Sequence, residues 1–205
     1  MSQSEFEPVD FYFDFSSPYA YFASTRIDKV AERGGRKCRW KPILLGPVFK
    51  ATGNALLITQ PMKGEYSRMD WDRMARFMEI PYQFPAKFPI NTMRAARLYY
   101  WLHDTDCSKA RDFARAVFKA YFADGIDVSG IEATLDVAQS VGVDRAEAEA
   151  AILDEANKQR LKDEVDAAIE RGVIGAPFFF VDGEGYWGSD RMWMIKKVLA
   201  GKQAF

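Results

Sequence analysis

The chain has 205 residues, of which 48% are hydrophobic and 28% are charged. Twenty-eight Lys and Arg against 29 Asp and Glu leave a net charge of −1, which argues against a broad electrostatic surface for nucleic acid or an anionic membrane. This length and composition predict a globular protein with one large domain, or with a small domain that carries an insertion.

Targeting and membrane signals are not evident in the sequence. The first ten residues, MSQSEFEPVD, are acidic and polar, so we expect no secretory leader or transit peptide. No run approaches the roughly 18 apolar residues of a membrane span, and the C-terminal GKQAF carries no lipidation or peroxisomal signal. We therefore expect a cytoplasmic protein with neither membrane nor nucleic acid as a partner.

Few residues are available for thiol or imidazole chemistry. Cys38 and Cys107 are far apart in sequence and lie outside any Cys-x-x-Cys motif, which argues against a disulfide framework and a cysteine-rich metal site. The single histidine, His103, cannot supply a multi-histidine zinc site, and no Gly-x-Ser-x-Gly motif accompanies it. No metal is therefore expected.

The first 45 residues have the pattern of a β-α-β unit. Apolar side chains alternate over residues 9–15, which predicts a strand, and Tyr12 within it indicates that both faces are covered. Ser17 is placed to cap a helix over about 18–33 that ends at Gly34-Gly35, with Pro18 at its first position. KCRWKPIL then predicts a second strand, parallel to the first.

Residues 46–156 predict a helical domain. GPVFKATGN and TQPMKGEY have the composition of loops. Three helix starts are indicated by Asn91-Thr92, by Ser129 with Glu132 as a capping box, and by Asp144 with Glu147. The helical periods that follow these loops cover residues near 67–79, 92–104, 108–123, 130–141 and 144–154.

The C-terminal part returns to a mixed pattern. A helix is expected over 158–171, followed by the strand PFFFV, a hairpin turn over 182–185, the return strand YWG and a helix capped by Ser189. The predicted fold is therefore α/β, with an α/β domain made of residues 1–45 and 157–205 and an all-α domain inserted at 46–156.

Ser17 is the first candidate for a functional role. A hydroxyl at a helix N-terminus lies beside unpaired backbone N–H groups, which stabilise an anion. The pKa of a serine hydroxyl is too high for the serine itself to become that anion without a base. Two interpretations remain open: Ser17 is a plain helix cap, or it donates a hydrogen bond to a bound anion.

Two further candidates lie near the C-terminus. Pro177 enters a buried strand, and a cis Ala176–Pro177 bond would turn the backbone of Ala176 toward a ligand, although the sequence alone does not establish a cis bond. In GSDR, Ser189 and Asp190 are either ordinary capping residues or a pair that binds an amino-acid-like zwitterion, with Asp190 on the ammonium group.

The order of these motifs is typical of a thioredoxin-like fold. DFSSPYAY occupies the place where disulfide oxidoreductases of this fold carry Cys-Pro-x-Cys, with Ser17 and Ala20 at the two cysteine positions. With TGN at 52–54, FPINTMRAARL at 88–98, IGAPFFFVDGE and YWGSDRM, the chain resembles the 2-hydroxychromene-2-carboxylate isomerases, relatives of the kappa-class glutathione transferases, over nearly its full length.

The resemblance implies glutathione as the cofactor and assigns a role to each matching residue. Ser17 would hydrogen-bond the glutathione sulfur and favour its thiolate, and Ala176 would pair its backbone with the cysteinyl unit. The other implied roles are Asn54 in a loop beside the tripeptide, Lys63 on the glycyl carboxylate, a cis Pro177, Ser189 and Asp190 on the γ-glutamyl end, and Asn91 and Arg94 on the substrate side.

The implied reaction interconverts 2-hydroxychromene-2-carboxylate and trans-o-hydroxybenzylidenepyruvate, or a related intermediate of aromatic degradation such as that of naphthalene, by reversible addition of the thiolate. A homodimer is implied as well. The alternatives are a kappa-like glutathione transferase or peroxidase that conjugates electrophiles, and a non-catalytic binding module. A redox role would need a dithiol, which Ser17 and Ala20 do not provide.

Overall fold

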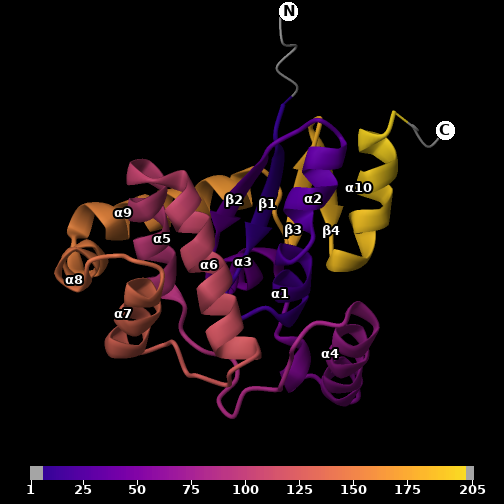
Figure 1. Cartoon of the computed structure of the whole chain (residues 1–205). Helices are drawn as coiled ribbons and strands as arrows, with labels where there is room; N and C mark the ends of the chain where they lie inside the picture. The colour runs from indigo at the N-terminus through magenta and orange to yellow at the C-terminus, as the bar shows by residue number, and fades with distance from the viewer. Residues whose placement is uncertain (1–6, 202–205) are drawn as a thin grey trace, which may run out of the picture.

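A computed structural model describes residues 7–201; residues 1–6 and 202–205, which include most of MSQSEFEPVD and of GKQAF, lie outside the described residues. Four strands form one mixed sheet in the order β2-β1-β3-β4 (Figure 1). β1 runs parallel to β2 and antiparallel to β3, and β3 pairs antiparallel with β4. The strands are β1 (Val9–Phe13), β2 (Cys38–Pro42), β3 (Phe178–Val181) and β4 (Glu184–Trp187).

Helices cover both faces of this sheet: α2 and α6 contact the face of Phe13 and Trp40, and α9 contacts the face of Tyr12 and Lys41. In Figure 1, α5 to α9 lie to the left of the strands and α10 to the right. No helix within residues 7–201 is both long and apolar enough to cross a membrane. The helices are α1 (Pro18–Ser24), α2 (Ile27–Arg33), α3 (Leu45–Thr52), α4 (Lys63–Met78), α5 (Met93–Thr105), α6 (Cys107–Phe122), α7 (Ile131–Ser140), α8 (Arg145–Leu153), α9 (Glu155–Glu170) and α10 (Met192–Leu199), with short 3₁₀ turns η1 (Leu57–Thr59) and η2 (Ser189–Arg191).

An aromatic core holds the helices against the sheet. Phe11 of β1 stacks on Phe179 of β3 with ring centroids 5.3 Å apart, and meets Trp40 of β2 edge-on at 5.2 Å. Phe13 contacts Phe118 of α6 at 5.5 Å. All five residues of β1 are buried, so the prediction of a strand covered on both faces is confirmed. Such aromatic pairs bury large apolar areas and prefer these offset and edge-on geometries.

The parallel β-α-β start is confirmed, but its predicted single helix is wrong. The chain forms α1 and α2 instead, separated at Thr25 and Arg26. The hydroxyls of Ser24 and Thr25 donate to the carbonyls of Tyr21 and Phe22. Side-chain bonds of this kind compete with the backbone ladder and favour a bend or an end.

The loop predicted over GPVFKATGN is also wrong, because this stretch forms most of α3. Pro47 lies in the first turn, where backbone N–H groups have no partner inside the helix and proline therefore costs little. Gly53, with a φ of 72°, ends the helix in the left-handed conformation that glycine tolerates. α4 likewise begins at Lys63, earlier than predicted, so it takes in part of the second expected loop.

The helix caps predicted from the sequence agree with the structure only in part. Asp144 caps α8 and accepts a hydrogen bond from the Glu147 N–H, as predicted. The Ser129 capping box is wrong: Gly130 is the N-cap of α7, and the Ser129 hydroxyl is bound by a lysine instead. The prediction for Ser189 is wrong as well, since it begins η2 and its side chain makes no capping bond.

The remaining boundaries differ by a few residues. The β3–β4 hairpin turns at Asp182 and Gly183, and the next two residues, predicted to be part of the turn, already belong to β4. Helix α9 begins at Glu155, so the expected domain boundary at 156/157 falls inside a helix.

Candidate active site

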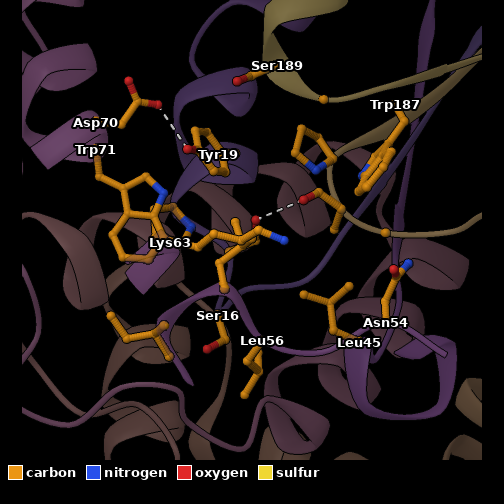
Figure 2. A pocket seen from close by; sticks show the side chains of 18 of the residues that line it. Ser16, Tyr19, Leu45, Asn54, Leu56, Lys63, Asp70, Trp71, Trp187 and Ser189 are labelled. Carbon is orange, nitrogen blue, oxygen red and sulfur yellow. Dashed lines mark hydrogen bonds between the residues drawn. The ribbon is translucent and has the colours of Figure 1, made fainter. Parts of the chain in front are cut away.

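A cavity of about 590 Å³ opens at the N-terminal end of α1 (Figure 2). Its walls come from segments far apart in sequence: the turn into α1, the stretch from α3 to α4, the loop before β3, and the end of β4 with η2. This volume lies within the range of small-molecule sites. The predicted residues among those lining it are Ser17, Asn54, Lys63, Ala176, Pro177, Ser189 and Asp190.

Ser17 sits at the base of this cavity and is 5% exposed. As the extended N-cap of α1, its Oγ accepts a hydrogen bond from the Ala20 N–H at 3.2 Å. The same hydroxyl donates to the Ala176 carbonyl at 3.1 Å, across 159 residues of sequence. The cap is therefore confirmed, and Ser17 also joins the start of α1 to the loop before β3.

The Ala176–Pro177 bond is cis, as the resemblance implied. Trp187 packs against the adjoining Gly175, where an added Cβ would lie 2.6 Å from the indole Nε1. Only glycine leaves room for this close approach. The half-exposed indole thus forms the wall of the cavity beside the Ala176 backbone (Figure 2).

Asn54, which follows α3, and Lys63, the first residue of α4, flank the cavity (Figure 2). The Asn54 side-chain amide donates to the Ile174 carbonyl at 3.2 Å, which ties this segment to the loop before β3. Lys63 Nζ donates to Gln60 Oε1 at 3.0 Å. Lys63 follows a tight turn at Met62, which has a φ of 61°, a strained value for a residue other than glycine.

Ser189 and Asp190 line the opposite part of the cavity, in η2. Asp190 is exposed, and its carboxylate accepts a charge-assisted hydrogen bond from the neighbouring Arg191 guanidinium at 2.7 Å. The two side chains thus place a hydroxyl, a carboxylate and a guanidinium at one edge of the cavity.

Asn91 and Arg94, predicted for the substrate side, are not among the residues that line this cavity. Asn91 is exposed, and its Oδ1 accepts from the Met93 N–H at the start of α5. Arg94 donates to the Ser129 carbonyl at 2.8 Å, which connects α5 to the segment before α7. Both side chains therefore have structural partners away from Ser17.

Asp14, which the sequence did not single out, supports the turn that carries Ser17. Its buried carboxylate accepts from the Ser16 N–H, the Leu45 N–H and the Thr92 hydroxyl, at 2.8 to 3.0 Å. Its own carbonyl accepts from the Ser17 N–H. Burial raises the pKa of Asp14, and the three hydrogen bonds oppose that rise.

Comparison with known proteins identifies the family. The model of the DsbA-like thioredoxin domain matches residues 8–200. A 2-hydroxychromene-2-carboxylate isomerase from Pseudomonas sp. (strain C18) is 35% identical over 197 residues, covering 94% of this chain and 90% of that protein. The chain belongs to the 2-hydroxychromene-2-carboxylate isomerase family. The predicted thioredoxin-like fold is thereby confirmed.

A solved structure of a 2-hydroxychromene-2-carboxylate isomerase is similar throughout, with a TM-score of 0.86, 32% identity and 95% of each chain covered. A kappa glutathione S-transferase from Caenorhabditis elegans is more distant, at 26% identity over 95% of this chain and 92% of that protein. The family resemblance seen in the sequence is therefore confirmed, and its relation to the kappa transferases as well.

Tyr19, Asp70 and Trp71 also line this cavity, and the sequence patterns did not indicate them as site residues. Tyr19 follows Ser17 by two residues, so its position in the motif was a usable signal. The inner face of α4 was harder to recognise, because this helix also exposes large apolar residues such as Tyr66 and Phe77. Apolar spacing alone could not tell which face covers the cavity.

Proposed function

We propose that this protein is a glutathione-dependent isomerase that interconverts 2-hydroxychromene-2-carboxylate and trans-o-hydroxybenzylidenepyruvate, or a closely related aromatic substrate. The observation that carries the proposal is the placement of Ser17, with its hydroxyl in a cavity beside the cis Ala176–Pro177 backbone. Relatives of 30–35% identity bear the name of this isomerase, which supports the same reaction class.

The side chains of the cavity fit the charges of glutathione, which has two carboxylates, one ammonium group and one thiol. Lys63 and Asp190 both line the cavity; Lys63 would bind one carboxylate, and Asp190 would pair with the ammonium group. Ser189 and the Asn54 amide add uncharged hydrogen-bonding groups, and the Ala176 backbone would pair with the central residue of the tripeptide. The relation to kappa glutathione transferases supports this choice of cofactor.

Ser17 acts in this proposal as a hydrogen-bond donor and not as a nucleophile. When bound, glutathione would supply a thiolate that adds reversibly to the conjugated enone and so permits rotation about a former double bond. The Ser17 hydroxyl has one proton, which it shares with the Ala176 carbonyl at 3.1 Å. Turning that proton to an adjacent sulfur would favour the thiolate while Oγ still accepts from the Ala20 N–H.

A kappa-like transferase or peroxidase is the second candidate, favoured by the same relatives and served by the same Ser17 arrangement. The two activities separate by their products: an isomerase regenerates glutathione, whereas a transferase accumulates an adduct with an electrophile. A dithiol mechanism is disfavoured, because neither Cys38 nor Cys107 lines the cavity within residues 7–201.

We also propose a homodimer in the cytoplasm, with the domain division at 46–156 expected from the sequence. α4 supports association with a second copy through a row of exposed apolar side chains, Tyr66, Met69 and Phe77, that share one face of the helix. Light scattering of the purified protein tests this, and a monomer would contradict it.

The deciding experiment follows the interconversion of the two compounds by absorbance, with and without glutathione. We expect turnover that requires glutathione and leaves its concentration unchanged. Turnover without glutathione would contradict the cofactor assignment. Adduct formation with chlorodinitrobenzene in the absence of isomerisation would favour the transferase.

A further inference from the structure

A hydrogen-bonded pair, Tyr19 and Asp70, faces the cavity on the side of α4 (Figure 2). The Tyr19 hydroxyl donates to Asp70 Oδ2 at 2.9 Å. The other carboxylate oxygen of Asp70 accepts from the Arg73 guanidinium at 3.2 Å, which holds the carboxylate in place. Neither Tyr19 nor Asp70 has a part in the proposed binding of glutathione.

The proton of Tyr19 is committed to Asp70. Burial raises the pKa of Tyr19, and the hydrogen bond and the negative charge of Asp70 raise it further. Tyr19 therefore stays protonated, and its hydroxyl donates its one hydrogen bond to the Asp70 carboxylate. A hydroxyl that already donates can offer only its oxygen lone pairs to a ligand, so Tyr19 presents an acceptor to the cavity.

Trp71 adds an unsatisfied donor beside this acceptor. Its side chain is 2% exposed, and its indole Nε1–H has no hydrogen-bond partner. The Trp71 side chain opposes in part the rise in the pKa of Tyr19. Buried polar groups without partners are uncommon and costly. Because this nitrogen is itself buried, Trp71 contributes its ring to the cavity, and the hydrogen bond to a ligand falls to Tyr19.

The surroundings of the pair are aromatic. The Trp71 ring stacks on Phe84 with an interplanar angle of 7° and contacts Phe88 at 5.4 Å, and Phe88 itself lines the cavity. Tyr19 meets Trp71 edge-on at 6.0 Å. A flat ring is thus favoured on this side of the cavity, and a hydroxyl on that ring is the smallest substituent that can donate to Tyr19.

We propose that Tyr19, oriented by Asp70, selects substrates by accepting a hydrogen bond from a hydroxyl group on the bound ring. This role rests on the proposed function, in that trans-o-hydroxybenzylidenepyruvate carries a phenolic hydroxyl on its ring; in 2-hydroxychromene-2-carboxylate that oxygen belongs to the closed ring and the hydroxyl is on C2. A ligand that lacks the hydroxyl would remove water from the Tyr19 oxygen without replacing the hydrogen bond. A site built in this way discriminates against such a ligand.

The test compares binding of trans-o-hydroxybenzylidenepyruvate and of its o-methyl ether by calorimetry, with and without S-methylglutathione. This glutathione analogue has no free thiol, so no turnover disturbs the measurement. We expect the wild-type protein to bind the hydroxyl compound about tenfold more tightly than the ether, the effect of about one hydrogen bond. Tyr19→Phe should reduce that ratio to near one.

Asp70→Ala tests the orientation of the hydroxyl. Without the carboxylate, the Tyr19 proton is free to turn into the cavity and donate to an ether oxygen, so the ether should bind more tightly than it does to wild type. Tyr21→Phe is the matched control: Tyr21 donates to the Pro81 carbonyl at 2.8 Å and does not line the cavity. It should keep the wild-type ratio.

The proposal is overturned if wild type binds both compounds equally, if it binds neither, or if Tyr19→Phe keeps the wild-type preference. Failure of the proposed function gives a different result. In that case the preference for the hydroxyl and its loss in Tyr19→Phe would persist, while the isomerase assay with glutathione would show no turnover.

Discussion

Replacing Ser17 with alanine removes two hydrogen bonds that the structure assigns to one hydroxyl. Loss of the N-cap bond to the Ala20 N–H costs about 1 kcal/mol. Loss of the bond to the Ala176 carbonyl costs about 1 kcal/mol more. The total of about 2 kcal/mol corresponds to a melting temperature lower by about 4–8 °C for a chain of this size.

The same substitution should change the chemistry of a bound thiol. A hydrogen bond to a charged acceptor contributes about 1.5–3 kcal/mol, and Ser17 must give up about 1 kcal/mol with Ala176 to make it. The net effect of about 0.5–2 kcal/mol is a rise of about one unit in the pKa of the thiol of bound glutathione. Turnover at neutral pH should fall about tenfold, with glutathione affinity nearly unchanged.

Ultraviolet absorbance of the bound thiolate against pH measures that pKa, and the pH dependence of turnover measures its consequence. Ser24→Ala is the matched control: Ser24 is as buried as Ser17, and its hydroxyl donates to the Tyr21 carbonyl at 2.7 Å, away from the cavity. It should lose stability without a change in the pKa of the thiol. Equal thiol pKa values and equal rate profiles in wild type and Ser17→Ala would refute the role of Ser17.

Three further substitutions test the cavity and the fold. Asp190→Ala should weaken glutathione binding about tenfold through the lost ammonium pair, and an unchanged dissociation constant in calorimetry would remove Asp190 from the site. Gly175→Ala should displace Trp187, because the added Cβ would lie 2.6 Å from its indole nitrogen. The tryptophan fluorescence should therefore shift and the affinity for glutathione should fall. An unaltered fluorescence spectrum would contradict this close contact. The hydrogen bond and charge of Arg36 lower the pKa of Asp182 below its ordinary value of 3.8. This ion pair therefore stabilises the fold fully at a pH above 3.8, and the stabilisation is lost as the pH falls through the lowered pKa. Asp182→Asn is the suitable change, because asparagine tolerates the φ of 52° found there. Its melting temperature should lie below that of wild type at neutral pH, and the difference should vanish in acid. A difference in melting temperature that does not depend on pH would refute the ion pair.

The parts of the fold predicted correctly are those that depend on neighbours in sequence. The alternation of β1 and the Ser17-Pro18 start of α1 are local patterns, and both are confirmed. Helix α3 was missed because its first N–H, that of Leu45, is satisfied by the Asp14 carboxylate, 31 residues away. No pattern within residues 45–52 could have indicated that partner.

The same limit applies to the candidate site. The Tyr19–Asp70 pair spans 51 residues, and the Ser17–Ala176 bond spans 159, so neither could be inferred from spacing. The family resemblance did give the cis Ala176–Pro177 bond, which composition and periodicity could not. It also suggested Arg94, whose guanidinium binds the Ser129 carbonyl and does not line this cavity, so its role toward the substrate stays a prediction.

Asp14 explains how a site assembled from distant segments keeps its geometry. Its carboxylate joins the turn before α1, the first residue of α3 and Thr92 before α5, while its carbonyl fixes the Ser17 N–H. A buried carboxylate with several donors is costly to form but restricts every segment that supplies one. The position of Ser17 is therefore set by contacts outside its own helix, and a short α1 can hold the hydroxyl against the loop before β3.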